Sequence, residues 1–351
     1  MEHMNQDYRK RNSRKRNRIP FVILSVVLLL VLGGVIFFAI KGNGNTQQTS
    51  GGDTQQENNT GNAEKWQEGI ISHDGKNYVY NKDIKVYLLM GIDSDEPAKP
   101  QTDYTKGGQS DAMFLLVTDA KEKSISVVSI NRNTMTRIEQ CYDTGASAGY
   151  KTSQICIQHG YGDGMNLSCT KTVNAVSHLF YNLPINGYLS IRMGALPMMN
   201  DAVGGVEVTV LDDLVNESKG VNLKKGETVT LNGQEAYIYL RGRDINEFDS
   251  ATNRLRRQEQ YITAYMDKLK AVAGGDASAA VKIYESIEDY IVSSIDFAGL
   301  VSEVSGYTYT SDNLYTIPGE TIMGEVYEEY YVDEEAFYDM MLEVFYTEVT
   351  Q

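Results

Sequence analysis

The sequence predicts an α/β fold, specifically an α/β/α sandwich around a mixed central β-sheet, preceded by one transmembrane helix. Three observations support this prediction: an uncharged N-terminal stretch of membrane-spanning length, three strand-length apolar runs, and amphipathic helical segments interleaved with further strand-like runs. Strands interleaved with helices around one sheet form layers of this kind. The expected organisation is a basic stub at 1–20, a transmembrane helix at 21–40, a flexible linker at 41–64 and an exterior domain at 65–351.

The transmembrane prediction depends on residues 21–40, FVILSVVLLLVLGGVIFFAI, which contain no charged side chain. A stretch of this length crosses a bilayer core of roughly 30 Å. The apolar core of a cleaved signal peptide is shorter, about 7–15 residues, and ends in a small-residue cleavage site. The basic stub indicates a cytoplasmic N-terminus, so we expect a single-pass protein of the cell membrane with its C-terminal bulk outside.

The charge of the chain limits its partners. The formal net charge is −15 although the stub is basic, so the exterior portion is strongly acidic. Nucleic-acid binding depends on a basic surface that neutralises phosphates. We therefore expect no nucleic-acid partner, and an anionic ligand would need a local positive patch.

The exterior domain is expected to begin with short elements and then with buried strands. Residues 41–64 are rich in Gly, Asn, Gln and Thr, which is typical of a flexible tether. Residues 70–80 predict a hairpin with Asp74-Gly75 as its turn. Apolar runs predict buried strands at 86–93, 112–118 and 124–130. The last two are joined by the short turn DAKEK and should pair antiparallel, which makes the sheet mixed.

The remainder alternates between helical and strand-like patterns. Helical patterns occupy 153–183, 194–203, 233–240, 251–272, 279–293, 297–305 and 334–345. Strands are expected at 188–191, at 206–210 and near 314–317. The Glu- and Tyr-rich segment 325–335 is interpreted as an acidic surface.

One charged stretch, 241–258 (RGRDINEFDSATNRLRRQ), concentrates arginines where one predicted helix ends and the next begins. On the second helix Arg254, Arg257 and Gln258 share a face, because residues three and four apart are neighbours there. Converging guanidinium groups suit a phosphate or pyrophosphate, which they bind bidentately. The alternative, a solvated and salt-bridged helix face, is the commoner role of an arginine-rich helix.

Charged side chains also stand at strand ends. Asp93 closes the first apolar run, Asp111 precedes the second and Arg132 follows the third. Ligand groups of α/β proteins commonly lie at strand ends, although a single aspartate there is more often a turn or cap residue. The two aspartates together offer oxygen ligands for Mg²⁺ or Mn²⁺, which often takes further oxygens from substrate phosphates.

Other chemistries have less support. The sequence contains no Gly-x-Ser-x-Gly elbow, no Gly-rich loop followed by Lys-Ser/Thr and no zinc-protease motif. His159, beside the turn GYGDG, is a weak catalytic candidate. An oxidising exterior permits one disulfide among the three cysteines, and we expect Cys156 to pair with Cys169 because they flank this turn.

An ordered series of motifs resembles the LytR-CpsA-Psr (LCP) family across residues 85–272: YLLMGID, GGQSDAMFLLV, SISVVSINRNTM, YNLPINGYLSI, NDAVGGVEVTV, LNGQEAYIYLRGRD and NRLRRQEQYI. The resemblance implies a phosphotransferase that moves a glycopolymer from a polyprenyl-pyrophosphate carrier onto a peptidoglycan acceptor through a phosphodiester bond. It also implies a hydrophobic groove for the lipid, a Mg²⁺ or Mn²⁺ cofactor and a Gram-positive-type envelope. The polymer, whether teichoic acid, capsule polysaccharide or a glycan on protein, is left open.

The resemblance also implies roles for individual residues. Asp93 and Asp111 would bind the metal. The pyrophosphate would be bound by Gln109, Arg132, Arg241, Arg243, Arg254, Arg257 and Gln258. Arg132, Arg241 and Arg243 would also act in catalysis, with Asp249 as the acid–base residue.

Two departures from the family pattern bear on these roles. Many relatives have arginine where this chain has Gln109, which brings no positive charge. The family also tends to have an aspartate three residues before the helix arginine, whereas Asp249 stands five before Arg254. Asp244 therefore competes with Asp249 as the base. A non-catalytic lipid-carrier binder or cell-wall sensor, and a pyrophosphatase that passes the phosphate to water, stay open as alternatives.

Overall fold

The computed structural model describes residues 69–242, 248–273, 283, 286–295, 300, 303–304, 307–309 and 311–349. The predicted stub, transmembrane helix and linker at 1–64 lie outside these residues. Within the described part of the chain, no helix has the length and apolar character needed to cross a bilayer.

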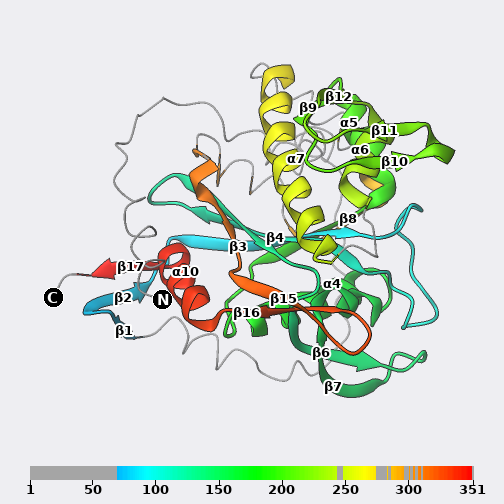
Figure 1. The fold of residues 1–351 in the computed structure, drawn as a ribbon. Helices are drawn as coiled ribbons and strands as arrows, with labels where there is room; N and C mark the ends of the chain where they lie inside the picture. The colour runs from blue at the N-terminus through cyan, green and yellow to red at the C-terminus, as the bar shows by residue number, and fades with distance from the viewer. Residues whose placement is uncertain are drawn as a thin grey trace, which may run out of the picture.

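A six-stranded mixed sheet forms the centre of the fold (Figure 1). Its order is β13 (Ile291–Ser293), β8 (Gly187–Arg192), β3 (Ile84–Ile92), β4 (Ser110–Asp119), β5 (Ser124–Ile130) and β14 (Leu314–Thr316). β3, β4 and β5 are successive antiparallel neighbours, whereas β8 lies parallel to β3 and β14 parallel to β5. The predicted strands and the mixed sheet are confirmed.

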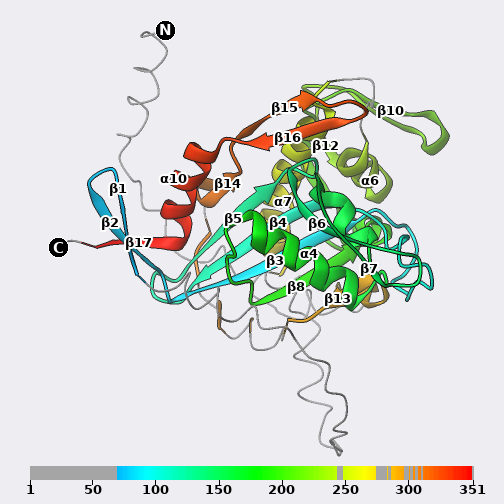
Figure 2. The same ribbon diagram turned by 90° about the horizontal axis from the view of Figure 1, so that it is seen from below.

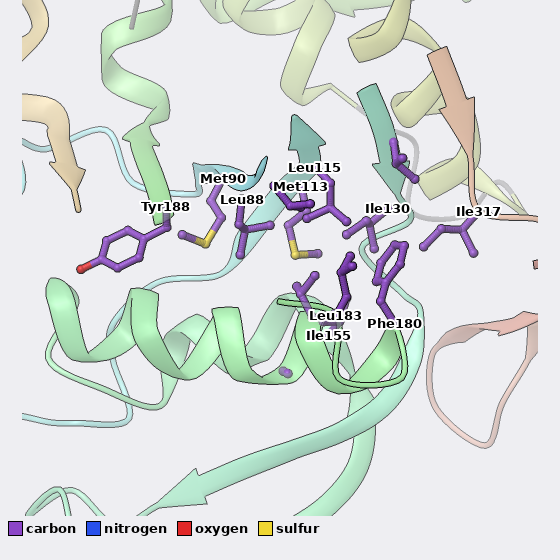
Figure 3. Packing of buried hydrophobic residues seen from close by; sticks show 14 of the residues in the cluster. Leu88, Met90, Met113, Leu115, Ile130, Ile155, Phe180, Leu183, Tyr188 and Ile317 are labelled. Carbon is purple, nitrogen blue, oxygen red and sulfur yellow. The ribbon is translucent and has the colours of Figure 1, made fainter. Parts of the chain in front are cut away.

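Helices cover both faces of this sheet, as predicted, with α7 (Ser250–Ala273) above it and α4 (Asn166–Leu179) below it in Figure 1. Successive strand residues point to opposite faces. Leu88 and Met90 extend toward α4 (Figure 3), and α10 (Glu334–Phe345) adds to the same core. Tyr87 belongs to the opposite core, to which α7 contributes Leu255. The sheet is therefore buried on both sides, which explains its continuous apolar runs.

A further core joins α7 to helices α5 (Leu196–Ala202) and α6 (Gly233–Arg241). Two small antiparallel sheets complete it: β9 (Val206–Thr209) with β12 (Thr228–Leu231), and β10 (Leu214–Asn216) with β11 (Val221–Leu223). α6 begins with a capping box in which Asn232 and Glu235 bond each other's backbone N–H. Tyr261 on α7 donates to Asn200 Oδ1 at 3.0 Å, which fixes α5 against α7.

The remaining elements are short. β1 (Ile70–His73), β2 (Lys76–Tyr80) and β17 (Tyr346–Val349) form one sheet, so the first and last described strands lie together. β6 (Met135–Cys141) pairs with β7 (Ser147–Gln154), and β15 (Gly319–Met323) pairs with β16 (Glu328–Val332). The 3-10 helices are η1 (Ile155–Gly160), η2 (Met193–Ala195), η3 (Glu217–Lys219), η4 (Glu288–Tyr290) and η5 (Ser311–Asn313). The predicted Asp74-Gly75 hairpin is confirmed, because both turn residues have the positive φ of a tight hairpin turn, 49° and 75°.

Two secondary-structure predictions need correction. The helical pattern at 153–183 divides into η1 and α4, because Asp163 in the intervening turn accepts the N–H groups of Met165 and Ser168 and starts a new helix. Ile291–Ser293, expected to end a helix at 279–293, is strand β13 at the edge beside β8. The segment 325–335, interpreted as an acidic surface, is largely exposed and also contains β16. Most of the predicted helix at 297–305 lies outside the described residues.

The expected disulfide is wrong, because all three cysteines are free and buried. Cys169 Sγ lies 3.7 Å from His159 Nε2 and 3.5 Å from Ser190 Oγ, whereas Cys156 belongs to η1 on the other side of the turn. Burial raises the pKa of the Cys169 thiol to about 12. Flanking a turn in the sequence did not bring the two sulfur atoms together.

Burial of the three free thiols predicts their reactivity. In the detergent-solubilised native protein, none should react rapidly with Ellman's reagent. After unfolding without reductant, all three should react. A Cys156–Cys169 disulfide would instead leave only one reactive thiol.

Candidate active site

The candidate site lies where three strand ends meet two helix ends. Ile92 at the end of β3 pairs with Ser110 at the start of β4, so Asp93 and Asp111 are placed at the same edge of the sheet. β5 runs antiparallel to β4 and ends at the same edge, which places Arg132 there. Arg241 is the last residue of α6, and Arg254 lies in α7 above the sheet.

Asp111 is the centre of the site. Its Oδ1 lies 2.9 Å from Arg132 Nη2, and its Oδ2 accepts a 3.0 Å hydrogen bond from Arg254 Nη1. All three side chains are buried, with exposed fractions of 9% or less. Charges removed from water in this way are tolerated only when they are paired. The sheet edge is therefore fastened to α7 through one carboxylate.

A second group of charges surrounds Arg241. Its Nη2 lies 2.6 Å from Asp93 Oδ1, and its Nη1 donates to the hydroxyl of Tyr237 one helical turn earlier. Tyr237 in turn donates to Asp95 Oδ1 at 2.6 Å. Burial and the bond to Asp95 raise the pKa of Tyr237 to about 12, so the phenol keeps its proton. We call the six charged groups the arginine–aspartate cluster: Asp93, Asp95, Asp111, Arg132, Arg241 and Arg254.

Gln109 joins the loop after β3 to the cluster. Its Oε1 accepts a hydrogen bond from Arg132, and its backbone carbonyl accepts the Asp93 N–H at 2.8 Å. His159 supports the same loop, with Nδ1 3.0 Å from the carbonyl of Gly107. Burial lowers the pKa of His159 to about 4, so the ring is neutral and its Nδ1–H donates. His159 thus stabilises the loop that presents Gln109.

Arg257 and Gln258 face the end of α6. Arg257 donates to the carbonyls of Tyr239 and Gly242 and pairs with Asp212, while Gln258 donates to the Leu240 carbonyl at 3.2 Å. Cations are favourable at a helix C-terminus. These contacts hold α6 in place and so orient Arg241. The predicted pyrophosphate contacts of Arg257 and Gln258 stay predictions.

Of the predicted catalytic residues between α6 and α7, the structure describes Asp249 alone. Arg243 and the competing base Asp244 lie outside the described residues. Asp249 immediately precedes α7, and its side chain accepts a 2.5 Å hydrogen bond from Thr321 on β15. Among the described residues, the Asp249 side chain therefore contacts the β15–β16 hairpin rather than the arginine–aspartate cluster, and its role as a base stays a prediction.

Sequence reasoning missed three residues of this region. Asp95 and Tyr237 complete the contacts of Arg241, and the spacing of Tyr237 and Arg241 by four on one helix was the available signal. Arg192, at the end of β8, is 5% exposed and donates to Ser94 Oγ at 2.9 Å and to the Gly164 carbonyl at 3.0 Å. Burial lowers the pKa of Arg192. The strand-end rule that selected Arg132 would also have selected Arg192.

An apolar cavity of about 200 Å³ lies between the sheet and the helical layer formed by α6 and α7. Its walls include Leu89, Phe114, Leu189, Ile191, Tyr261 and Ile262. Gln258 also lines it, one turn of α7 from Arg254. The polar cluster and the apolar cavity are therefore neighbours, which suits an amphiphilic ligand with an anionic head and an apolar chain.

A sequence model of the LytR_cpsA_psr family matches residues 40–343. The chain belongs to this family. The polyisoprenyl-teichoic acid–peptidoglycan teichoic acid transferase TagV of Bacillus subtilis (strain 168) is 29% identical over 260 residues, which are 71% of this chain and 60% of that protein. TagT of the same strain, which has the same descriptive name, is 30% identical over 220 residues, 61% of this chain and 60% of that protein.

The fold is also similar to that of a solved structure with a related sequence. The crystal structure of B. subtilis TagV is similar with a TM-score of 0.53 and 25% identity, over 75% of this chain and 96% of that chain. The chain spans about 60% of the length of the two curated relatives named above.

The cluster of this LytR_cpsA_psr family member offers oxygen ligands to a divalent metal. Asp93 Oδ1 and Asp111 Oδ1 are buried and, within the described part of the chain, accept no hydrogen bond, although each lies within ion-pair distance of an arginine. The described residues contain no group of three or more His, Cys, Asp or Glu side chains able to hold a metal. The remaining ligands would have to be phosphate oxygens or water, as is usual for Mg²⁺.

Removing the central carboxylate should destabilise the protein. In Asp111→Ala, Arg132 and Arg254 remain buried without their shared partner, so the free energy of unfolding should fall by about 3–5 kcal/mol. Urea denaturation followed by circular dichroism measures this change. Glu122→Ala, an exposed residue in the turn after β4, should leave the midpoint nearly unchanged. Equal midpoints for the two variants would contradict a buried charge network.

Proposed function

We propose that the chain is a phosphotransferase that moves a glycopolymer from a polyprenyl-pyrophosphate carrier onto peptidoglycan through a phosphodiester bond. The observation that carries this proposal is that the arginine–aspartate cluster, whose central residues Asp111, Arg132 and Arg254 are buried, lies next to an apolar cavity. A pyrophosphate head matches the former and an isoprenoid chain the latter. The curated names of TagV and TagT describe the same class of transfer for those relatives.

The reaction requires one bond to form and one to break. The acceptor hydroxyl oxygen bonds to the sugar-linked phosphorus, the bond from that phosphorus to the bridging oxygen breaks, and polyprenyl phosphate leaves with the electron pair. Phosphoryl transfer depends mainly on positioning and charge stabilisation. Arg132, Arg241 and Arg254 would supply both, because their paired carboxylates already orient them before the substrate binds.

A Mg²⁺ or Mn²⁺ ion is part of the proposal. The three carboxylates and three guanidinium groups of the arginine–aspartate cluster carry no net charge together, so a bound pyrophosphate would leave the site negative. The ion would be held by Asp93 and Asp111 with phosphate oxygens, and would supply Lewis-acid stabilisation of the developing charge. The arginines bind and orient the pyrophosphate.

The proton of the acceptor hydroxyl needs a base. A carboxylate within reach of that hydroxyl would take it. We assign this role to Asp249, with Asp244 as its competitor.

Residues 21–40 would anchor the catalytic domain outside the cell membrane, where both the lipid carrier and peptidoglycan are present. Teichoic acid and capsule polysaccharide are both suitable polymers.

A non-catalytic carrier binder is the second candidate function. Two observations favour it: Gln109 contributes no positive charge beside Arg132, and the Asp249 carboxylate is bonded to Thr321. A binder would hold the lipid without converting it. A pyrophosphatase would release a polymer phosphate in place of an acceptor-linked product.

Transfer can be tested with the detergent-solubilised full chain, a polyprenyl-pyrophosphate oligosaccharide, a peptidoglycan fragment and Mg²⁺. Mass spectrometry should detect the phosphodiester-linked product, and EDTA should abolish it. Arg241→Ala removes one charge-stabilising donor, so kcat should fall about 10²–10³-fold.

Arg256→Ala is the matched control for this test, because Arg256 is exposed on α7 and should be dispensable. Tight lipid binding without product across several acceptors would favour the binder. Formation of the polymer phosphate alone would favour the pyrophosphatase.

The apolar cavity makes a separate prediction about the carrier chain. Ile262→Trp replaces an aliphatic side chain that lines the cavity with a bulky indole ring, and should weaken binding of a fluorescent polyprenyl phosphate. If the indole ring excludes two methylene groups of the lipid from the cavity, at about 0.8 kcal/mol each, Kd should rise about tenfold. Val272→Trp, on the exposed side of the same helix, should leave Kd unchanged. If both variants bind polyprenyl phosphate like the wild type, the isoprenoid chain of the carrier lies outside this cavity.

A further inference from the structure

The β15–β16 hairpin is a part of the fold that the proposed reaction does not yet use. It passes beside the start of α7 (Figure 1 and Figure 2). In its antiparallel register Thr321 lies opposite Tyr330, and Met323 lies opposite Glu328. Opposite residues project from the same face of a hairpin, as do residues two apart on one strand. Thr321, Glu328 and Tyr330 therefore share one face and are turned toward the protein, whereas Met323, at the tip of the same face, is exposed.

The first anchor of this face is Asp249. Thr321 Oγ1 donates to Asp249 Oδ1 at 2.5 Å, and the backbone N–H of Asp249 donates to Glu328 Oε1 at 2.7 Å. The two strands of the hairpin thus hold the side chain and the backbone of one residue. Asp249 has a φ of 62°, a left-handed conformation that persists only where the surroundings impose it. The hairpin supplies such surroundings at the first turn of α7.

The second anchor is the loop that carries Arg132. The Tyr330 N–H donates to the carbonyl of Asn133 at 3.0 Å. Gln154 Nε2 donates to the carbonyl of Glu328 at 2.6 Å and to Asn133 Oδ1 at 3.2 Å. Tyr330 is buried, and its hydroxyl donates to the carbonyl of Ile317 at 2.7 Å. The hairpin is therefore fixed to the residue that follows Arg132.

A hydrogen bond also joins the Arg132 loop directly to α7. Asn131 Nδ2 donates to Thr252 Oγ1 at 3.0 Å, so the loop before Arg132 also contacts α7. Arg132 and Arg254 meet at the two oxygens of Asp111. Their separation thus depends on how the Arg132 loop sits against the start of α7. The hairpin spans these same two segments.

A solvated acidic surface explains only the outer face of the hairpin. Glu320, Ile322 and Tyr331 are exposed there, and Glu329 accepts a hydrogen bond from the Tyr331 hydroxyl. Glu328 and Thr321 are partly buried on the inner face and bond to Asp249 instead. The inner and outer carboxylates of one strand therefore provide a matched comparison.

We propose that Thr321 and Glu328 are positioning residues of the transfer site. They act through Asp249, holding the start of α7 against the Arg132 loop so that Arg254 and Arg132 converge on the pyrophosphate. This inference depends on the proposed function for its effect on activity, and on the contacts alone for its effect on structure. It assigns a role to the chain after residue 272.

Thr321→Val tests the inference in the detergent-solubilised full chain. Valine keeps the shape of threonine but cannot donate a hydrogen bond to the Asp249 carboxylate. Loss of a hydrogen bond to a charged group changes an equilibrium or rate constant by about tenfold. We expect kcat for transfer to fall about tenfold, because the arginines are less well placed for the transition state, and KM for the lipid donor to change less than kcat, because the apolar cavity is untouched. Thr321→Ser, which restores the hydroxyl, should recover kcat. Glu329→Gln, on the outer face, should behave like the wild type.

Hydrogen exchange read by mass spectrometry gives a second measurement that needs no turnover. The peptide covering 248–256 should exchange faster in Thr321→Val than in the wild type, and at the wild-type rate in Thr321→Ser. Unchanged exchange in Thr321→Val overturns the proposal, as does a kcat equal to that of Glu329→Gln. If the wild type transfers nothing, the proposed function fails, and the exchange rates alone decide whether the hairpin holds this segment.

Discussion

The pairing of Asp111 with Arg132 and Arg254 is the interaction on which the arrangement of the site depends. These three residues come from β4, the end of β5 and α7, so one carboxylate fastens the sheet edge to the helical layer. The charges are buried and must stay paired, because an isolated charge in this environment costs several kcal/mol. In the proposed reaction, an entering pyrophosphate would exchange partners with the carboxylates without leaving any guanidinium uncompensated. The proposed anion site would then be arranged before the substrate binds.

The position of α6 extends this arrangement toward the apolar cavity. Arg257 and Gln258 bond the carbonyls at the end of α6, and this fixes Arg241 beside Asp93. The same turns of α7 line the cavity with Tyr261 and Ile262. One helix therefore supplies both the polar contacts and the apolar wall, from successive turns of the same face, because residues three and four apart are neighbours on a helix. An amphiphilic ligand is matched along a single element.

The sequence predicted the sheet and much of the cluster because those features follow local rules. Continuous apolar runs identified β3, β4 and β5, and the strand-end rule placed Asp93, Asp111 and Arg132 together. The contacts of Tyr237 with Asp95 were not predictable, because they depend on how α6 docks. The β15–β16 hairpin was missed because its inner face resembles solvated sequence: the partners of Glu328 and Thr321 are a backbone N–H and a carboxylate far away in the chain. Arg243 and the anchor lie outside the described residues, so their roles remain predictions.

The order of strands in the central sheet has a consequence for how the chain folds as it is made. Both edge strands, β13 and β14, come from the last part of the sequence, and β17 pairs with β2 at the opposite end of the chain. Until these segments emerge, β8 and β5 present unpaired edges, which are templates for association with other chains. Pairings between distant segments also form slowly. A growing chain of this protein therefore exposes both edges of its central sheet until its C-terminal segment is available.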